Sequence, residues 1–120
     1  MNLTIQDLKE LISTESKSNN HLDKLLLGKD VIIRTYSAGV HFGTLIEKYE
    51  NEVILKNGRM LWYWKTANTG ISLSEIAMFG IHADSKVCVA VPLRWLEAIE
   101  ISICSDEAIK SIKQQPNYTA

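Results

Sequence analysis

The feature that most constrains the fold is a change of hydrophobic period at Lys29. From there to residue 103, most runs alternate apolar with polar residues, as in DVIIRTYS at 30–37 and VHFGTLIEKY at 40–49. A period of two places successive side chains on opposite faces of a β-strand. The runs are separated by short turns, SAG at 37–39 and ENE at 50–52. Short connections favour antiparallel pairing of consecutive strands.

Further turn and strand signals refine this sheet. Asn57 and Gly58 lie between two apolar runs, which predicts a tight hairpin there. Gly43 in the middle of a run indicates a bulge or a close backbone approach. SKVCVAV at 85–91 reads as a strand whose end, or whose place at a sheet edge, is marked by Pro92. A half-buried strand follows at 99–103.

Helix signals interrupt and follow the strands. Ser72 and Glu75 form a capping box that opens a helix, and Gly80 is placed to close it. Ser105 caps a last helix that Pro116 ends. The sequence therefore predicts an α+β fold: an antiparallel, strongly curved sheet or small, partly open β-barrel of five to six strands. It carries one inserted helix, a C-terminal helix and a short helical N-terminal arm.

The chain divides into three parts on these patterns. Residues 1–28 form the N-terminal arm, residues 29–115 a single β-rich domain, and residues 116–120 a tail that we expect to be frayed. One face of the arm's first helix carries Ile5, Leu8, Leu11 and Ile12. STESKSNN at 13–20 has the composition of a linker, and Gly28 is placed to end a second short helical turn. The arm's apolar face needs a covering surface, on this domain or on a partner chain.

Composition excludes several function classes. The 120 residues carry a net charge of −1, so no global field draws the chain to nucleic acid or to a membrane. We expect no membrane partner and no long nucleic acid. The N-terminus lacks the basic-then-apolar pattern of a secretion signal, which indicates a cytosolic protein. The two cysteines, Cys88 and Cys104, alternate with apolar residues and are expected in the core.

No catalytic or metal-binding pattern stands out. The histidines at 21, 41 and 82 fall in no recognisable nucleophile or base signature, and no Cys or His pair has zinc-ligand spacing. The six glycines are isolated, and none forms a phosphate-binding loop. We therefore expect no enzyme activity, no cofactor and no metal.

The segment RMLWYWK at 59–65 is the candidate site. As a strand it would place Met60, Trp62 and Trp64 on one face, and Leu61, Tyr63 and Lys65 on the other. One interpretation is a central strand whose second face is covered by the 72–80 helix or by another subunit. The other is a stacking platform, because aromatic faces with nearby guanidinium groups suit a nucleobase and its phosphate. The predicted ligand-binding residues are Arg34, Tyr36, Arg59, Trp62, Tyr63, Trp64 and Lys65.

Four stretches carry a resemblance to a known family. VIIRTYSAGVHFGTL, LKNGRMLWYWK, SLSEIA and EAIEISICSDEAIKSI, in this order, resemble a small family of proteins of tailed phages and prophages. The likeness covers residues 30–112 and implies a phage-encoded protein in the cytoplasm of the infected bacterium. A weaker likeness is to phage anti-defence sponges, which sequester the cyclic nucleotide signals of Thoeris or CBASS immunity. It implies a homo-oligomer, and no ligand-contacting residue is carried over from it.

Three functions follow as expectations. The first is a non-enzymatic, homo-oligomeric protein that sequesters a small nucleotide-derived immune signal. The second is a virion component, or an inhibitor that docks on a host or phage protein through the aromatic row and the 1–28 arm. The third is a small barrel that binds single-stranded nucleic acid, with an affinity that falls steeply with salt.

Overall fold

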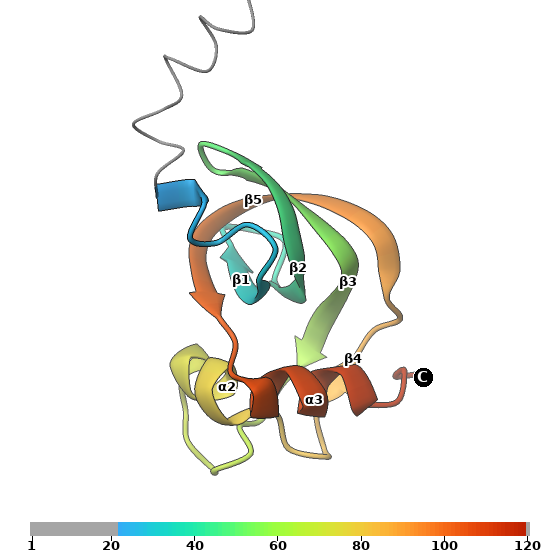
Figure 1. Ribbon diagram of the computed structural model, residues 1–120. Helices are drawn as coiled ribbons and strands as arrows, with labels where there is room; N and C mark the ends of the chain where they lie inside the picture. The colour runs from blue at the N-terminus through green and yellow to red at the C-terminus, as the bar shows by residue number, and fades with distance from the viewer. Residues whose placement is uncertain (1–21, 120) are drawn as a thin grey trace, which may run out of the picture.

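The computed structural model describes residues 22–119. In chain order its elements are β1 (Asp30–Thr35), β2 (Val40–Tyr49), β3 (Glu52–Tyr63), α2 (Leu73–Phe79), β4 (Lys86–Val87), β5 (Val91–Ile103) and α3 (Asp106–Gln114). The predicted α+β class is confirmed, because one five-stranded antiparallel sheet packs with these two helices (Figure 1). The predicted helix over 5–12 and the linker over 13–20 lie outside the described residues. Between residues 22 and 119, no helix has the length and hydropathy to cross a bilayer.

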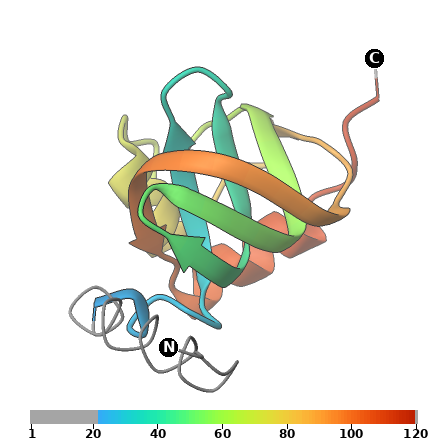
Figure 2. The same cartoon turned by 90° about the horizontal axis from the view of Figure 1, so that it is seen from above.

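The sheet is strongly curved. Its strand order is β2-β1-β5-β3-β4, and β2 pairs with β3 as well. This extra pairing makes the sheet curl back on itself and partly close, as Figure 2 shows from above. Partial closure leaves few unpaired strand edges, and the outermost strand, β4, has only two residues. The predicted curvature is therefore confirmed.

Two apolar clusters hold the sheet and the helices together. The first, which we call the sheet core, contains only strand residues: Val31, Ile33, Leu45, Val53, Leu55, Leu96 and Ala98. The second, the helix core, joins strand residues to both helices: Ile32, Phe42, Leu61, Ile76, Ile81, Val87, Cys104, Ala108 and Ile112. Neighbouring β1 residues point into different cores, so β1 is buried on both faces. Burial on both faces explains why the sequence of β1 is an almost continuous apolar run.

Both predicted helices are confirmed together with their caps. The Ser72 hydroxyl accepts from the Glu75 N–H and donates to the Glu75 carboxylate at 2.9 Å. This hydrogen bond is the main cause that lowers the pKa of Glu75. The Ser105 hydroxyl accepts from the Ala108 N–H and donates to the Met78 carbonyl, so the N-cap of α3 also contacts α2. The predicted end at Gly80 is confirmed by its N–H, which donates to Ile76.

The two cysteines differ in burial. Cys104 lies in the helix core, where burial raises the pKa of its thiol to about 12, and the charge of Asp30 acts in the same direction. Cys88, just beyond β4, is half-buried. Its backbone carbonyl takes part in the contacts of Arg59 described below.

The predicted hairpin at residues 57–58 is wrong. β3 runs without a break from Glu52 to Tyr63, and the β2–β3 hairpin turns at 50–51, as the ENE signal predicted. β3 pairs with β2 along one edge and with β5 along the other as far as Gly58. A continuous strand satisfies backbone groups on both edges, and this outweighs the local preference of Asn-Gly for a turn. Asn57 keeps a left-handed φ of 54°.

The prediction for Gly43 is confirmed. The β2–β3 register shifts between Phe42 and Thr44, so a bulge lies at this point. A Cβ on Gly43 would lie 3.1 Å from the Lys56 carbonyl oxygen and 3.2 Å from the Gly58 Cα. The two backbones approach so closely here that a larger residue would push β3 away.

The region around Pro92 also differs from the prediction. The expected strand over 85–91 is reduced to the two residues of β4, and residues 88–90 lie outside any strand. Pro92 is the second residue of β5, so it does not end a strand, but β5 pairs only with β3 before Ala98, which leaves Pro92 at a sheet edge as the alternative predicted. The ladder pairs Val91 with Gly58 and Leu93 with Lys56, and Pro92 lies exposed between them. Proline has no backbone N–H to donate to the ladder, and such a residue is tolerated near the start of a strand.

The ends of the described chain are both tied to the sheet. Gly28, with φ of 81°, ends a short helical turn as predicted, and its N–H donates to Leu45. The expected fraying of the C-terminal tail is wrong at residues 117 and 118. Asn117 forms a bridge with Val87, and the Tyr118 N–H donates to the Val87 carbonyl at 2.8 Å. The buried Arg59 side chain of β3 also donates a hydrogen bond to Asn117 in this tail.

We expect His41 to make the stability of the fold depend on pH. Its ring is buried, Nε2 lies 2.8 Å from the Ala38 carbonyl, and Nδ1 has no hydrogen-bond partner within residues 22–119. Burial lowers the pKa of His41 below 6.5, the Ala38 hydrogen bond opposes this, and the charge of Arg94 adds to it. The unfolded chain therefore takes up a proton before the folded chain does. We expect the free energy of unfolding to fall as pH drops below about 6.5.

Urea unfolding between pH 7.5 and pH 5 measures this effect. The variant H41Q removes the titrating ring, so its stability should fall less over the same interval. Identical pH slopes for the two proteins would show that His41 is not the cause.

Candidate functional site

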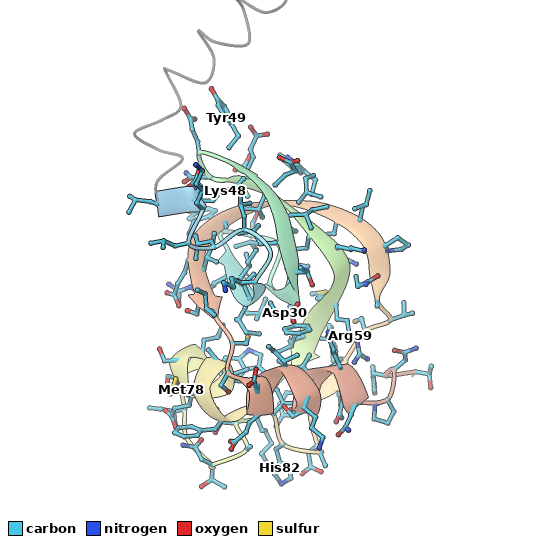
Figure 3. All side chains as sticks on the ribbon, in the orientation of Figure 1. Asp30, Lys48, Tyr49, Arg59, Met78 and His82 are labelled. Carbon is cyan, nitrogen blue, oxygen red and sulfur yellow. The ribbon has the colours of Figure 1, made fainter. Side chains whose placement is uncertain are left out.

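A cavity of about 420 Å³ lies between the sheet and α3. Figure 3 shows Asp30 and Arg59 at the end of the sheet above α3. The walls come from β1, β2, β3, the segment before β5, α3 and the tail. The lining residues are Asp30, Phe42, Gly43, Thr44, Lys56, Asn57, Arg59, Val89, Ala90, Lys113, Gln115 and Asn117. The bulge at Gly43 and the left-handed Asn57 both belong to this lining, so the cavity lies at the irregular part of the β2–β3 ladder.

The lining carries more positive than negative charge. Lys56, Arg59 and Lys113 are cationic, and Asp30 is the carboxylate among the lining residues. Asp30 accepts from the Thr44 hydroxyl at 2.5 Å and lies 3.7 Å from the Lys113 ammonium. Within the described chain, neither Lys56 nor Arg59 forms an ion pair. A cavity with unbalanced cations favours an anionic occupant.

Arg59 is the most buried of these cations, at 6% exposure. Its guanidinium donates to the carbonyl oxygens of Cys88 at 2.8 Å and Ile112 at 2.5 Å, and to Asn117 Oδ1 at 2.9 Å. These neutral acceptors come from two parts of the chain: Cys88 follows β4, and Ile112 and Asn117 lie in and just after α3. Ile112 lies in the last turn of α3, where the helix dipole favours a cation. Burial lowers the pKa of Arg59, but an arginine side chain stays charged in proteins.

An aromatic cluster lies beside the tail. The rings of Trp62 and Tyr118 stack with centroids 5.6 Å apart and planes 7° from parallel. Lys86 Nζ lies 5.2 Å from the Trp62 centroid, 5.7 Å from that of Tyr63 and 5.1 Å from that of Tyr118. The three rings are 40–58% exposed. We call these four residues the aromatic cluster.

The predicted faces of the aromatic segment are wrong, because the strand is irregular at Trp62. The β3–β4 register shifts between Leu61 and Tyr63, and this irregularity leaves both Trp62 and Tyr63 exposed. Trp64 follows the end of β3 and packs against the helix core. Leu61 and Trp64 are therefore covered by the chain's own residues, as the first interpretation predicts, whereas Trp62 and Tyr63 are exposed.

The remaining predicted residues lie apart from the cavity lining. Lys65 lies 3.8 Å from the Asp84 carboxylate at an exposed position. Arg34 lies at the same distance from the Glu100 carboxylate, also exposed. Tyr36 lies in the β1–β2 turn and is almost fully exposed. The structure thus brings Trp62 and Tyr63 together, places Arg59 in the cavity and separates the rest.

Several residues of both regions escaped sequence reasoning. The cavity residues Lys56 and Lys113 are isolated cations in a strand and a helix, so no local pattern connects them. Lys86 and Tyr118 join the aromatic cluster only because β4 and the tail pair through Val87. Among these residues, only Tyr118 could have been noticed in the sequence, because an aromatic residue is unexpected in a tail that was predicted to be frayed.

No three His, Cys, Asp or Glu side chains between residues 22 and 119 gather closely enough to hold a metal ion. The polar groups that line the cavity are three cations, three amide side chains, the Thr44 hydroxyl and the Asp30 carboxylate, which already has partners. This set of groups can bind and orient an anion.

Comparison with known proteins gives one match. The protein-family model described as Domain of unknown function (DUF6948) matches residues 28–112. No curated protein and no solved structure matches the chain.

Proposed function

We propose that this chain, which belongs to the DUF6948 family, is a non-enzymatic binding domain. Its ligand is small, phosphate-bearing and nucleotide-like, and it is held in the cavity between the sheet and α3. The charge of the cavity carries this proposal. The whole chain has a net charge of −1, yet the cavity lining has three cations and one carboxylate. Such a local reversal of sign concentrates anions at one place on an otherwise weakly acidic protein.

The size and chemistry of the lining support a ligand of this class. A volume of about 420 Å³ lies within the range of pockets that hold small organic ligands. The ammonium groups of Lys56 and Lys113 suit phosphate oxygens, and Phe42, Val89 and Ala90 supply an apolar wall. A ligand with both an anionic part and a flat apolar part matches a cavity that has cations on one part of its lining and apolar side chains on another. Asn117, which lines the cavity, adjoins Tyr118 of the aromatic cluster.

The biological setting of the proposal comes from the resemblance of residues 30–112 to phage and prophage proteins. In that setting the ligand is a nucleotide-derived immune signal in the bacterial cytoplasm, and the protein, as a homo-oligomer, removes the signal by holding it. Sequestration needs affinity and no chemical step, which agrees with a lining suited to binding.

Thermal unfolding with candidate ligands tests the proposal. The panel contains inorganic phosphate, cyclic ADP-ribose isomers and cyclic oligonucleotides. A ligand that binds only the folded state raises the melting temperature as its concentration rises. We expect a rise with at least one nucleotide. No rise with any member of the panel at millimolar concentration contradicts the proposal.

Two lysine substitutions locate the site. K56Q and K113Q remove cations from the lining and leave the buried Arg59 contacts intact. Because a hydrogen bond to a charged group contributes about 1.5–3 kcal/mol, each change should weaken binding about tenfold to a hundredfold by titration calorimetry. K110Q, also on α3 but outside the lining, is the matched control and should bind like the wild type. Equal affinity of all three variants would place the ligand elsewhere.

A protein-binding role is the second candidate, and the aromatic cluster favours it. Stacking holds Trp62 and Tyr118 in one orientation, and both rings are substantially exposed. Rigid, exposed aromatic residues are enriched at the centres of protein interfaces. W62A should then abolish capture of one stoichiometric host or phage protein without changing nucleotide binding.

A further inference from the structure

Three side chains form a polar row across the sheet side of the cavity. Thr44 of β2 pairs with Asp30 of β1 on one edge and with Lys56 of β3 on the other, so the three residues lie at one level on adjacent strands. All three line the cavity. Because neighbouring strands lie about 4.8 Å apart, the row places a carboxylate about two strand spacings from an ammonium group, with a hydroxyl group between them.

The carboxylate at one end of this row keeps an oxygen available to a ligand. Asp30 Oδ1 accepts from the Thr44 hydroxyl at 2.5 Å. Asp30 Oδ2 lies 3.7 Å from the ammonium group of Lys113 on α3, which is too long for a hydrogen bond, and it accepts no hydrogen bond from residues 22–119. Lys113 is largely exposed, so its ammonium group can turn to a phosphate and leave Oδ2 to another donor.

A carboxylate in this place makes the cavity selective among anions. Asp30 is the carboxylate of the lining, and its charge repels a phosphate that Lys56 or Lys113 holds. A ligand that also offers a hydroxyl group to Oδ2 offsets this repulsion with a charge-assisted hydrogen bond, which is stronger than a neutral one. An anion without such a donor meets the repulsion alone. The lining therefore favours a ligand that carries hydroxyl groups at a distance from its phosphate.

We propose that Asp30 is a specificity residue of this site, where its Oδ2 accepts a hydrogen bond from a sugar hydroxyl of the ligand. The cavity then prefers ribose phosphates to analogues whose sugar lacks these hydroxyl groups. A ribose presents its 5′-phosphate and its 2′- and 3′-hydroxyl groups at different corners of one ring, which matches a row with Lys56 at one end and Asp30 at the other. This inference rests on the function proposed above and adds the class of sugar that the ligand carries.

Titration of the wild-type protein with two matched nucleotides, followed by NMR, tests the proposal. Adenosine 5′-monophosphate carries both hydroxyl groups, and 2′,3′-dideoxyadenosine 5′-monophosphate carries neither. The loss of one hydrogen bond to a charged group should weaken binding of the dideoxy nucleotide about tenfold to a hundredfold.

Two variants separate the carboxylate in the cavity from a change of net charge. D30N keeps an oxygen that can accept from Thr44 but removes the negative charge. It should lose most of the preference and bind the dideoxy nucleotide more tightly than the wild type does. E100Q removes the same charge from an exposed residue outside the lining, and should keep the wild-type preference.

The outcomes distinguish this inference from the function on which it rests. Similar affinities of the wild type for the two nucleotides, or an unchanged preference in a folded D30N, overturn the role of Asp30 and leave the anion site in place. The wild-type comparison decides the matter by itself if D30N does not fold. Binding of neither nucleotide at millimolar concentration also overturns the inference, and thermal unfolding with the panel above then decides the proposed function separately.

Discussion

Replacing Gly80 with alanine is expected to destabilise the fold by about 2–4 kcal/mol, because strain and crowding add at this position. Gly80 caps α2 with φ of 90° and ψ of −168°, a region open almost only to glycine. A Cβ there would collide with the Ser111 hydroxyl and lie 3.3 Å from the Ala108 Cα. Both residues belong to α3, so the change forces the two helices apart. Guanidinium unfolding followed by circular dichroism measures the loss.

Gly28 offers a control that separates the two causes. It also has a positive φ, of 81°, but a Cβ there would meet no atom within 4 Å. G28A should therefore show the backbone cost alone, about 1–2 kcal/mol. Equal losses for G80A and G28A would contradict the role of close packing between α2 and α3.

Replacing Arg59 with methionine is expected to have the largest effect, a loss of about 3–5 kcal/mol. The change keeps much of the side-chain volume but leaves the Cys88 carbonyl without its side-chain donor, and the Ile112 carbonyl keeps only the Gln115 N–H at 3.3 Å. A buried acceptor that loses its partner costs about 1–3 kcal/mol. The β4 segment, the end of α3 and the tail would also lose their common contact. A domain at the lower end of the typical stability range of about 5–15 kcal/mol would then be only marginally folded.

Two further variants test the geometry at Arg59. R59K keeps the charge, but one ammonium cannot reproduce a planar fork that reaches three separate acceptors, so we expect an intermediate loss. R34M removes an exposed arginine whose ion pair spans 3.8 Å, and should change stability by less than about 1 kcal/mol. Urea unfolding compares the three variants. If R59M were as stable as R34M, the buried contacts of Arg59 would not be stabilising.

The Arg59 result also separates structure from binding. Arg59 lines the cavity, but its donors bond to carbonyl oxygens and to Asn117. Loss of ligand binding in R59M would therefore follow from unfolding as well as from lost charge. The lysines of the cavity are the better probes, because Lys113 is largely exposed and Lys56 forms no ion pair in residues 22–119.

Sequence patterns alone determined the features that depend on near neighbours. The caps at Ser72 and Ser105 and the helix end at Gly80 were all predictable, because each is set by groups within a few residues. The hydrophobic period of two residues, which is also a local property, correctly predicted antiparallel β-strands. The curvature followed from the short turns, and the glycine at 43 predicted the bulge or close backbone approach that the structure confirms.

Tertiary structure alone decided the features that depend on distant partners. Residues 57–58 have the local preference of a hairpin, but pairing with β2 and β5 on both edges keeps them inside β3. Arg59 was predicted as a ligand contact, and its burial became visible only with the carbonyls of Cys88 and Ile112 around it. The cavity unites Lys56 and Lys113 from a strand and a helix that are far apart in the sequence. Local propensities amount to fractions of a kcal/mol per residue, whereas unpaired buried groups cost more, so long-range pairing prevailed wherever the two disagreed.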